Sequence, residues 1–239
     1  MDAYVAHPSD GNPHPLVIIF MDIWGLREEL FAIARRVAGE GYYCVVPNLF
    51  YREGKFSYEP RDADGRMLSF VKLPQDIQKD MRARADRLNR ETLRVDVAAI
   101  LEFCRHEPVS VQAAGSIGYC MGGREAFFAA QEFPDCFRAT ASLHGSRLAI
   151  AANDSPHRLT HKMRGEVYCG FAEFDQGAPP DVVRAVEQAL GSVAGLTFKS
   201  RLHPGAHHGY ALPDRDIHDH QAAEQDWADI FAMFRRQLG

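Results

Sequence analysis

The segment whose residues most clearly suggest catalysis is Gly118-Tyr119-Cys120-Met121-Gly122-Gly123. It follows a short apolar run and opens a helix-like stretch. The Gly-x-Cys-x-Gly spacing is typical of a nucleophile elbow, a cramped turn from strand to helix in which glycines leave room for strained backbone. Amide hydrogens at the start of a helix stabilise negative charge, so we expect a lowered pKa for the Cys120 thiol. The Met121 amide is placed to bind a developing oxyanion. The pattern therefore predicts that Cys120 is a nucleophile.

A cysteine nucleophile needs a base and an acid that orients the base, and the expected chain order is nucleophile, then Asp or Glu, then His. Asp175 follows the apolar run at 167–171. His207 and His208 follow the run at 196–202. Both loops would leave the C-terminal edge of a parallel sheet, where open α/β sheets bind their ligands. Asp175 is thus the candidate acid, and either histidine is a candidate base.

The elements that must position these residues alternate along the chain. Short apolar runs predict strands at 16–21, 42–46, 116–119, 139–143, 167–171 and 196–202. Helical spacing of apolar residues predicts helices at 26–38, 75–89, within 90–106, at 123–132, 180–190 and 219–236. This alternation predicts parallel βαβ units, and Pro204-Gly205 predicts a turn after the last strand.

Length and composition narrow the class of protein. The chain has 239 residues, 46% of them hydrophobic, which fits one α/β or barrel-sized domain. With 27 Lys and Arg against 32 Asp and Glu, the net charge of −5 gives no basic field for nucleic acid or anionic lipid. The longest apolar run, 16–21, is too short to span a membrane, and no signal-peptide pattern opens the chain, so we expect a cytoplasmic protein. Five cysteines without CxxC spacing predict free thiols.

From about Ala3 to Arg236 the chain resembles the dienelactone hydrolase family of α/β-hydrolases. The motifs that carry the resemblance are Asp22-Ile23-Trp24-Gly25, Pro47-Asn48-Leu49, the Cys120 elbow, the loop Gly170 to Asp175, and the loop Gly205 to Tyr210. The resemblance implies an α/β-hydrolase fold, with a mostly parallel central sheet flanked by helices on both faces. It further implies a single domain over 1–239, with an excursion at about 50–90 over the pocket.

By this resemblance Cys120 is the nucleophile, Asp175 the orienting acid and His208 the base, because His208 directly precedes Gly209. The implied reaction is hydrolysis of an ester or lactone of the carboxymethylenebutenolide type, through an acyl-thioester and without cofactor or metal. The amides of Ile23 and Met121 would hold the oxyanion. We expect a small-molecule substrate as the partner, and a monomer or homodimer.

Substrate contacts and one departure from the family pattern concern other residues. The family usually has Glu where this chain has Asp22, so Asp22 either reaches the thiol through water or caps the following turn. Arg52 matches a family arginine that could bind a substrate carboxylate, or it is a solvated loop residue. Trp24 and Tyr119 are expected to contact substrate. The arginine expected a few residues after the histidine is shifted or absent, since the segment reads Tyr210 to Arg215. This leaves another ester, lactone or thioester as a possible substrate.

Other interpretations remain open. Several late histidines could hold a metal, although the turn predicted at Pro204-Gly205 does not align them as a helix would: His203, His207, His208, His218 and His220. A non-catalytic thiol redox sensor, with Cys120 oxidised rather than acylated, is an alternative of a different class. The segment His144-Gly145-Ser146 lacks a Gly-x-Ser-x-Gly pattern and is predicted to be a strand end lining the pocket.

Overall fold

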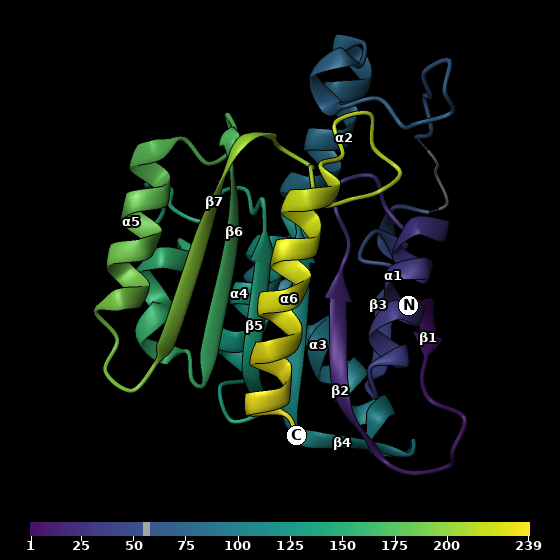
Figure 1. Ribbon diagram of the computed structural model, residues 1–239, viewed down its shortest axis with the longest axis vertical. Coiled ribbons are helices and arrows are strands. Elements are labelled where there is room, and N and C mark those ends of the chain that lie inside the picture. The colour runs from purple at the N-terminus through teal and green to yellow at the C-terminus, as the bar shows by residue number, and fades with distance from the viewer. Residues whose placement is uncertain (55–57) are drawn as a thin grey trace.

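The computed structural model describes residues 1–54 and 58–239, and over these ranges the chain forms a seven-stranded sheet with helices on both faces (Figure 1). The strands are β1 (Ala3–Ala6), β2 (His14–Phe20), β3 (Tyr43–Pro47), β4 (Val109–Tyr119), β5 (Phe137–Leu143), β6 (Glu166–Phe174) and β7 (Thr197–His207). The α-helices are α1 (Glu28–Gly39), α2 (Gln75–Arg87), α3 (Arg90–Cys104), α4 (Met121–Glu132), α5 (Pro180–Gly191) and α6 (His220–Gln237). Short 3-10 helices are η1 (Tyr51–Glu53), η2 (Phe70–Lys72) and η3 (Pro156–Lys162).

The order of the strands is β1-β3-β2-β4-β5-β6-β7. Each neighbouring pair is parallel except β1 with β3. Parallel neighbours need a crossover between them, and the helices supply it. The carboxyl ends of β2 to β7 therefore meet at one edge, and the predicted mostly parallel sheet is confirmed.

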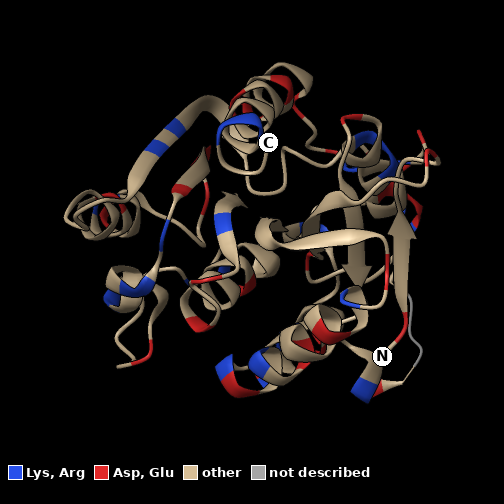
Figure 2. Cartoon of the chain, turned by 90° about the horizontal axis from the view of Figure 1, so that it is seen from below, with Lys and Arg blue, Asp and Glu red and all other residues tan. Residues whose placement is uncertain are grey.

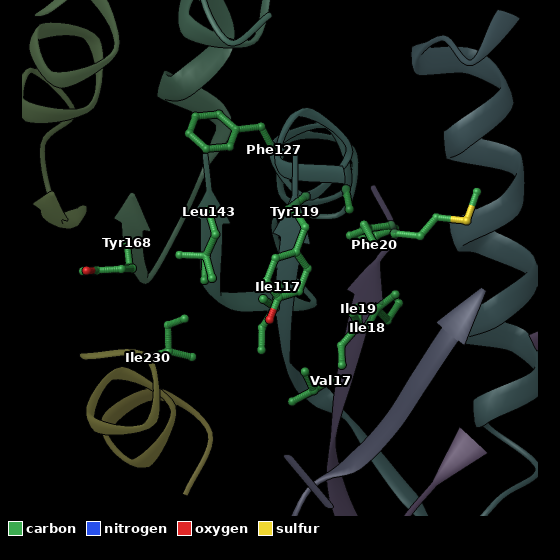
Figure 3. Close-up of a cluster of buried hydrophobic side chains, with 14 of the residues drawn as sticks. Val17, Ile18, Ile19, Phe20, Ile117, Tyr119, Phe127, Leu143, Tyr168 and Ile230 are labelled. Atoms are coloured by element: carbon green, nitrogen blue, oxygen red, sulfur yellow. The ribbon is translucent and has the colours of Figure 1, made fainter. Parts of the chain in front are cut away.

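Helices cover both faces of the sheet. Helix α6 lies in front of the sheet in Figure 1, with α3 and α4 behind it. Helix α1 shares the α6 face, since the Arg36 guanidinium lies 4.6 Å from the Trp227 ring centroid. The central strand β2 is largely apolar and is buried between these layers, as Figure 3 shows for Val17 and Ile18, with Ile117 of the neighbouring strand β4; all three residues are fully buried. Strands buried on both faces read as continuous apolar runs, which is why the run at 16–21 was a reliable strand signal.

The structure differs from the predicted elements in three places. Strand β1 was not predicted; it is a short antiparallel edge strand and is only partly buried. Strands β4 and β7 are longer than predicted, because polar residues extend both. The turn predicted at Pro204-Gly205 is wrong: these residues lie inside β7, where the pairing shifts between Ala172↔His203 and Phe174↔His207. Gly205, with φ of 78°, permits this bulge.

The segment between β3 and α3 packs on Trp24 as a second apolar cluster, with Met67, Leu73 and Met81. Residues 55–57 of the predicted excursion lie outside the described residues. Figure 2 shows basic and acidic residues interspersed along the outer helices. Among the described residues, no helix is both long enough and apolar enough to cross a membrane.

Candidate active site

Cys120 occupies a strained turn between β4 and α4. Its φ of 56° and ψ of −115° lie outside the common regions for a side-chain-bearing residue. A Cβ placed on Gly118 would lie 1.9 Å from the Gly122 carbonyl oxygen, so this position requires glycine. The predicted elbow geometry is present, and it exposes the cysteine side chain at the carboxyl edge of the sheet.

The start of α4 is pressed against the end of β2. A Cβ on Gly122 would lie 2.2 Å from the Phe20 carbonyl oxygen. This close approach brings the Met121 amide beside the turn that carries the Ile23 amide. In that turn the Gly25 amide donates to the Asp22 carbonyl over 3.2 Å, so the Ile23 peptide is held in a defined orientation. The two amides predicted to hold an oxyanion thus sit on adjoining, rigid segments.

The structure brings Cys120, His208 and Asp175 together from the ends of β4, β7 and β6. The imidazole of His208 lies close enough to the Cys120 thiol for the two groups to shift each other's pKa. The Nδ1 atom of His208 lies 2.7 Å from Asp175 Oδ2. Asp175 Oδ1 accepts the Gly177 amide over 2.7 Å, which fixes the carboxylate. The arrangement is compatible with the nucleophile, base and acid roles expected from the chain order, and these roles stay predictions.

The electrostatics of the site favour a charged pair. Burial raises the pKa of the Cys120 thiol, but the charge and hydrogen bond of His208 outweigh burial, and the thiol pKa lies below its ordinary value. Burial also lowers the pKa of His208, yet the sulfur charge and the Asp175 hydrogen bond bring that pKa well above its ordinary range. The arrangement therefore supports a thiolate beside an imidazolium.

Asp22 caps its turn. Its Oδ1 accepts the Trp24 amide over 3.2 Å, and Arg27 donates to its two carboxylate oxygens over 2.6 and 3.1 Å. Asp22 is 1% exposed, and the hydrogen bonds of the described residues do not join it to the Cys120 thiol. Of the two alternatives for Asp22, the geometry favours the cap; its remaining effect on the thiol is through charge.

Arg52 has a partner within the chain. It donates to both oxygens of Asp96 over 2.8 and 2.7 Å, and its guanidinium lies 4.4 Å from the Tyr51 ring centroid. Arg52 also lines a cavity of about 460 Å³ beside the end of β3. A substrate carboxylate would have to share this guanidinium with Asp96.

Arg215 is the first arginine after His208 in the chain, and it lies near enough to Cys120 for their charges to interact. Its side chain is 4% exposed, with the guanidinium 4.2 Å from the Trp24 ring centroid and 3.5 Å from Asp22 Oδ2. Its Nε has no partner among the described residues. Burial lowers the pKa of Arg215, and its charge interacts with the Cys120 sulfur. The position of Arg215 near Cys120 could not be predicted from the sequence, because Arg215 follows the histidine at an unexpected spacing.

Both aromatic residues predicted to contact substrate, Tyr119 and Trp24, are buried. Tyr119 is fully buried, and Figure 3 shows its ring within the hydrophobic core, because successive strand residues point to opposite faces and Cys120 faces the site. Trp24 is 5% exposed and covers Arg215.

The segment after β5 contributes residues that the sequence analysis placed only as a strand end. Ser146 Oγ lies 3.9 Å from Cys120 Sγ. The ring of His144, fully buried, contacts the His208 ring edge-to-face at 5.1 Å between centroids. Burial, with the nearby His208 and Arg215 charges, holds the pKa of His144 well below its ordinary range. His144 is therefore an uncharged side chain that packs against the ring of the candidate base.

The loop that carries His208 is anchored from α6. Asp226, fully buried, accepts hydrogen bonds from the Tyr210 and Tyr168 hydroxyls, each over 2.6 Å, and lies 2.7 Å from His203 Nε2. A Cβ on Gly170 would lie 2.5 Å from the Tyr210 hydroxyl, so the network also requires this glycine. One carboxylate thus fixes both sides of the β7 bulge.

The remaining predicted ligands and thiols are dispersed. His203 pairs with Asp226, His208 with Asp175, and His218 with the Tyr210 carbonyl. All five cysteines are free, as predicted; Cys44, Cys104 and Cys169 are buried, and Cys136, which precedes β5, is partly buried. Burial raises the pKa of all four thiols, which leaves Cys120 as the cysteine with a lowered pKa.

Comparison with known proteins places this geometry in a family. A protein of Synechocystis sp. named "Putative carboxymethylenebutenolidase" is 28% identical over 243 residues, covering 98% of this chain and 91% of the relative. A protein of the same name from Escherichia coli O157:H7 is 25% identical, and the match covers 100% of this chain and 83% of that relative. The crystal structure titled "Putative Dienelactone Hydrolase" from Klebsiella pneumoniae has a TM-score of 0.81 at 21% identity, covering 98% of this chain and 92% of that one, which confirms the α/β-hydrolase fold. The family model described as dienelactone hydrolase matches residues 1–238. The chain therefore belongs to the dienelactone hydrolase family of hydrolases.

Proposed function

We propose that this protein hydrolyses a small ester or lactone through a covalent thioester on Cys120. The observation that carries the proposal is one arrangement of three residues: Cys120 lies on a strained elbow, its pKa is lowered by the nearby His208, and His208 Nδ1 lies 2.7 Å from Asp175 Oδ2. The lowered pKa of the thiol and the raised pKa of the imidazole support the same roles. A reactive thiolate beside a general acid is what acyl transfer requires.

The proposed acylation step begins with attack of the Cys120 sulfur on the substrate carbonyl carbon. The S–C bond forms while the carbonyl π electrons move to oxygen, where the amides of Ile23 and Met121 donate to the developing charge. The tetrahedral intermediate then collapses, and the C–O bond to the leaving group breaks. His208 gives its Nε2 proton to the leaving oxygen, with Asp175 holding the imidazole orientation.

Deacylation reverses these roles with water as the nucleophile. Neutral His208 removes a proton from water as the water oxygen attacks the thioester carbon. The C–S bond breaks, the acid product leaves, and Cys120 returns as a thiolate beside the imidazolium. No cofactor is needed for this sequence of steps.

The substrate class rests on the relatives and on Arg215. Because two relatives carry the name carboxymethylenebutenolidase, a lactone of the carboxymethylenebutenolide type is the first compound to test. Arg215, with an unpartnered Nε, offers positive charge near the sulfur for a substrate carboxylate. Arg52 stays a second candidate, in competition with Asp96.

A substrate panel tests the proposal. Lactones and simple esters, each with and without a carboxylate, are assayed with the wild type and with Cys120→Ala, and acid-quenched wild type is examined by mass spectrometry. We expect turnover and an acyl adduct on the Cys120 peptide in the wild type, and neither in Cys120→Ala. Undiminished turnover by Cys120→Ala would refute the nucleophile. A wild type without turnover that gives only a sulfenic acid adduct after peroxide would favour the redox-sensor alternative.

A further inference from the structure

Ser146 lies against the sulfur of Cys120. Its Oγ is 3.9 Å from Sγ, within hydrogen-bonding range for sulfur, and the described residues give this hydroxyl no other partner. The backbone holds it there, because the Ser146 amide donates to the Cys120 carbonyl over 3.0 Å. The nucleophile and the serine therefore move as one unit.

The segment that presents Ser146 is held in an unusual conformation. His144 and Arg147, on either side, have φ of 38° and 58°, which side-chain-bearing residues rarely adopt. Arg147 is ion-paired with Asp86 at the end of α2, and this pair ties the segment across the site. Backbone strain of this kind persists only where the surrounding structure enforces it.

Ser146 is also placed beside the other reacting groups. A Cβ on Gly177 would lie 3.4 Å from Ser146 Cβ and 3.8 Å from His208 Cε1, so Gly177 adjoins both the serine and the candidate base. A thiolate has no hydrogen of its own. In the charged pair, the serine hydroxyl is therefore the donor and the sulfur the acceptor.

We propose that Ser146 is a further catalytic residue, whose hydroxyl donates a second hydrogen bond to the Cys120 thiolate alongside the imidazolium of His208. This role deepens the proposed hydrolase function and rests on it. The hydrogen bond stabilises the resting thiolate and is lost when the sulfur becomes a thioester, since the negative charge has then moved to the substrate oxygen. Ser146 thus makes the thiolate available at lower pH and reduces its intrinsic nucleophilicity.

The test measures alkylation of Cys120 rather than turnover. The rate of carbamidomethylation of the Cys120 peptide by iodoacetamide is followed by mass spectrometry across acid to alkaline pH in the wild type, in Ser146→Ala and in the matched control Ser142→Ala. Ser142 is a suitable control, since it is a fully buried serine of β5 whose hydroxyl has no partner among the described residues. Thermal unfolding of each variant confirms that it is folded.

The rate of alkylation against pH gives two apparent pKa values for the coupled pair, and we expect Ser146→Ala to raise the lower of the two by about one unit. This is the effect of losing one charge-assisted hydrogen bond. The limiting rate of the thiolate should rise roughly threefold, because nucleophilicity increases with thiol pKa. Ser142→Ala should match the wild type in both quantities. Ser146→Gly should repeat the Ser146→Ala shift, and it replaces that variant if the alanine protein does not fold.

Identical profiles for Ser146→Ala, Ser146→Gly and Ser142→Ala would overturn the role of Ser146. A pKa shift with a fall in limiting rate would also overturn it, because a disturbed backbone rather than a lost hydrogen bond would then be the cause. Failure of the hydrolase proposal is distinguishable, since it appears as turnover retained by Cys120→Ala and does not affect the alkylation readout.

Discussion

Arg27 binds both carboxylate oxygens of Asp22, over 2.6 and 3.1 Å, and so holds this aspartate within its own turn. Arg27 also donates to Asp214 over 2.5 Å, and Arg215 approaches Asp22 from the other side. A carboxylate enclosed in this way is not free to accept a proton from Cys120. The aspartate fixes the turn that carries the Ile23 amide, while its charge acts on the sulfur at a distance.

Asp22→Asn should make the thiolate form at lower pH. Burial and the negative charge of Asp22 both raise the pKa of Cys120, so removing the charge lowers that pKa and moves the acid limb of Cys120 alkylation to lower pH. The amide can still accept the Trp24 hydrogen bond, but the protein should lose about 3 kcal/mol of stability in urea unfolding as Arg27 loses a buried partner. Movement of the acid limb to higher pH would instead show that Asp22 takes the thiol proton.

The two adjacent histidines should differ sharply. His208→Ala removes the imidazole that interacts with both Cys120 and Asp175. We therefore expect kcat/KM for an activated ester to fall by roughly 100- to 10,000-fold. His207 stacks beside Phe174 with 5.1 Å between ring centroids, so His207→Ala should stay close to the wild-type rate. Steady-state kinetics on both variants decides the assignment, and equal losses would contradict it.

Activity should show a bell-shaped dependence on pH. As pH falls through the lowered pKa of Cys120, the thiolate is protonated and kcat/KM declines. As pH rises through the raised pKa of His208, the imidazolium loses the proton that the leaving group needs, and kcat/KM declines again. The two limbs belong to the coupled pair. A profile that only rises up to the ordinary thiol pKa would contradict the charged pair.

Gly118→Ala should destabilise the protein by about 3 kcal/mol or more, because its Cβ would overlap the Gly122 carbonyl and neither backbone segment can move. Gly39→Ala is the matched control: Gly39 ends α1, and its added Cβ meets nothing within 4 Å. This variant should gain roughly 0.5–1 kcal/mol. Urea unfolding of both proteins measures the difference. A mild effect at Gly118 would mean that the elbow is less tightly packed than described.

The sequence predicted those features that local chemistry determines. The glycines around Cys120 mark the elbow, because both short contacts there involve residues within a few positions of the cysteine or the end of the neighbouring strand. Asp175 and His208 were predicted because each lies in a loop after a predicted strand, and parallel strands bring such loops to one edge. The family resemblance then favoured His208 over His207.

Features that depend on distant contacts were missed or wrong. Nothing local shows that Arg27 encloses Asp22, that Arg52 pairs with Asp96, or that Arg215 lies near the thiol. The sequence of the β7 bulge predicts a turn, because Pro204-Gly205 is found both in turns and in bulged strands. Only the pairing of β7 with β6 shows that it is a bulge. No sequence motif marks Ser146, because its contact with the Cys120 sulfur arises only when the end of β5 packs beside the elbow.

The three hydrogen bonds to Asp226 couple the loop that carries His208 to helix α6. Loss of this carboxylate would leave two tyrosine hydroxyls and one imidazole nitrogen unsatisfied in the core. Because Tyr210 lies only two residues after His208, a packing defect in α6 would displace the His208 imidazole as well as loosen the fold.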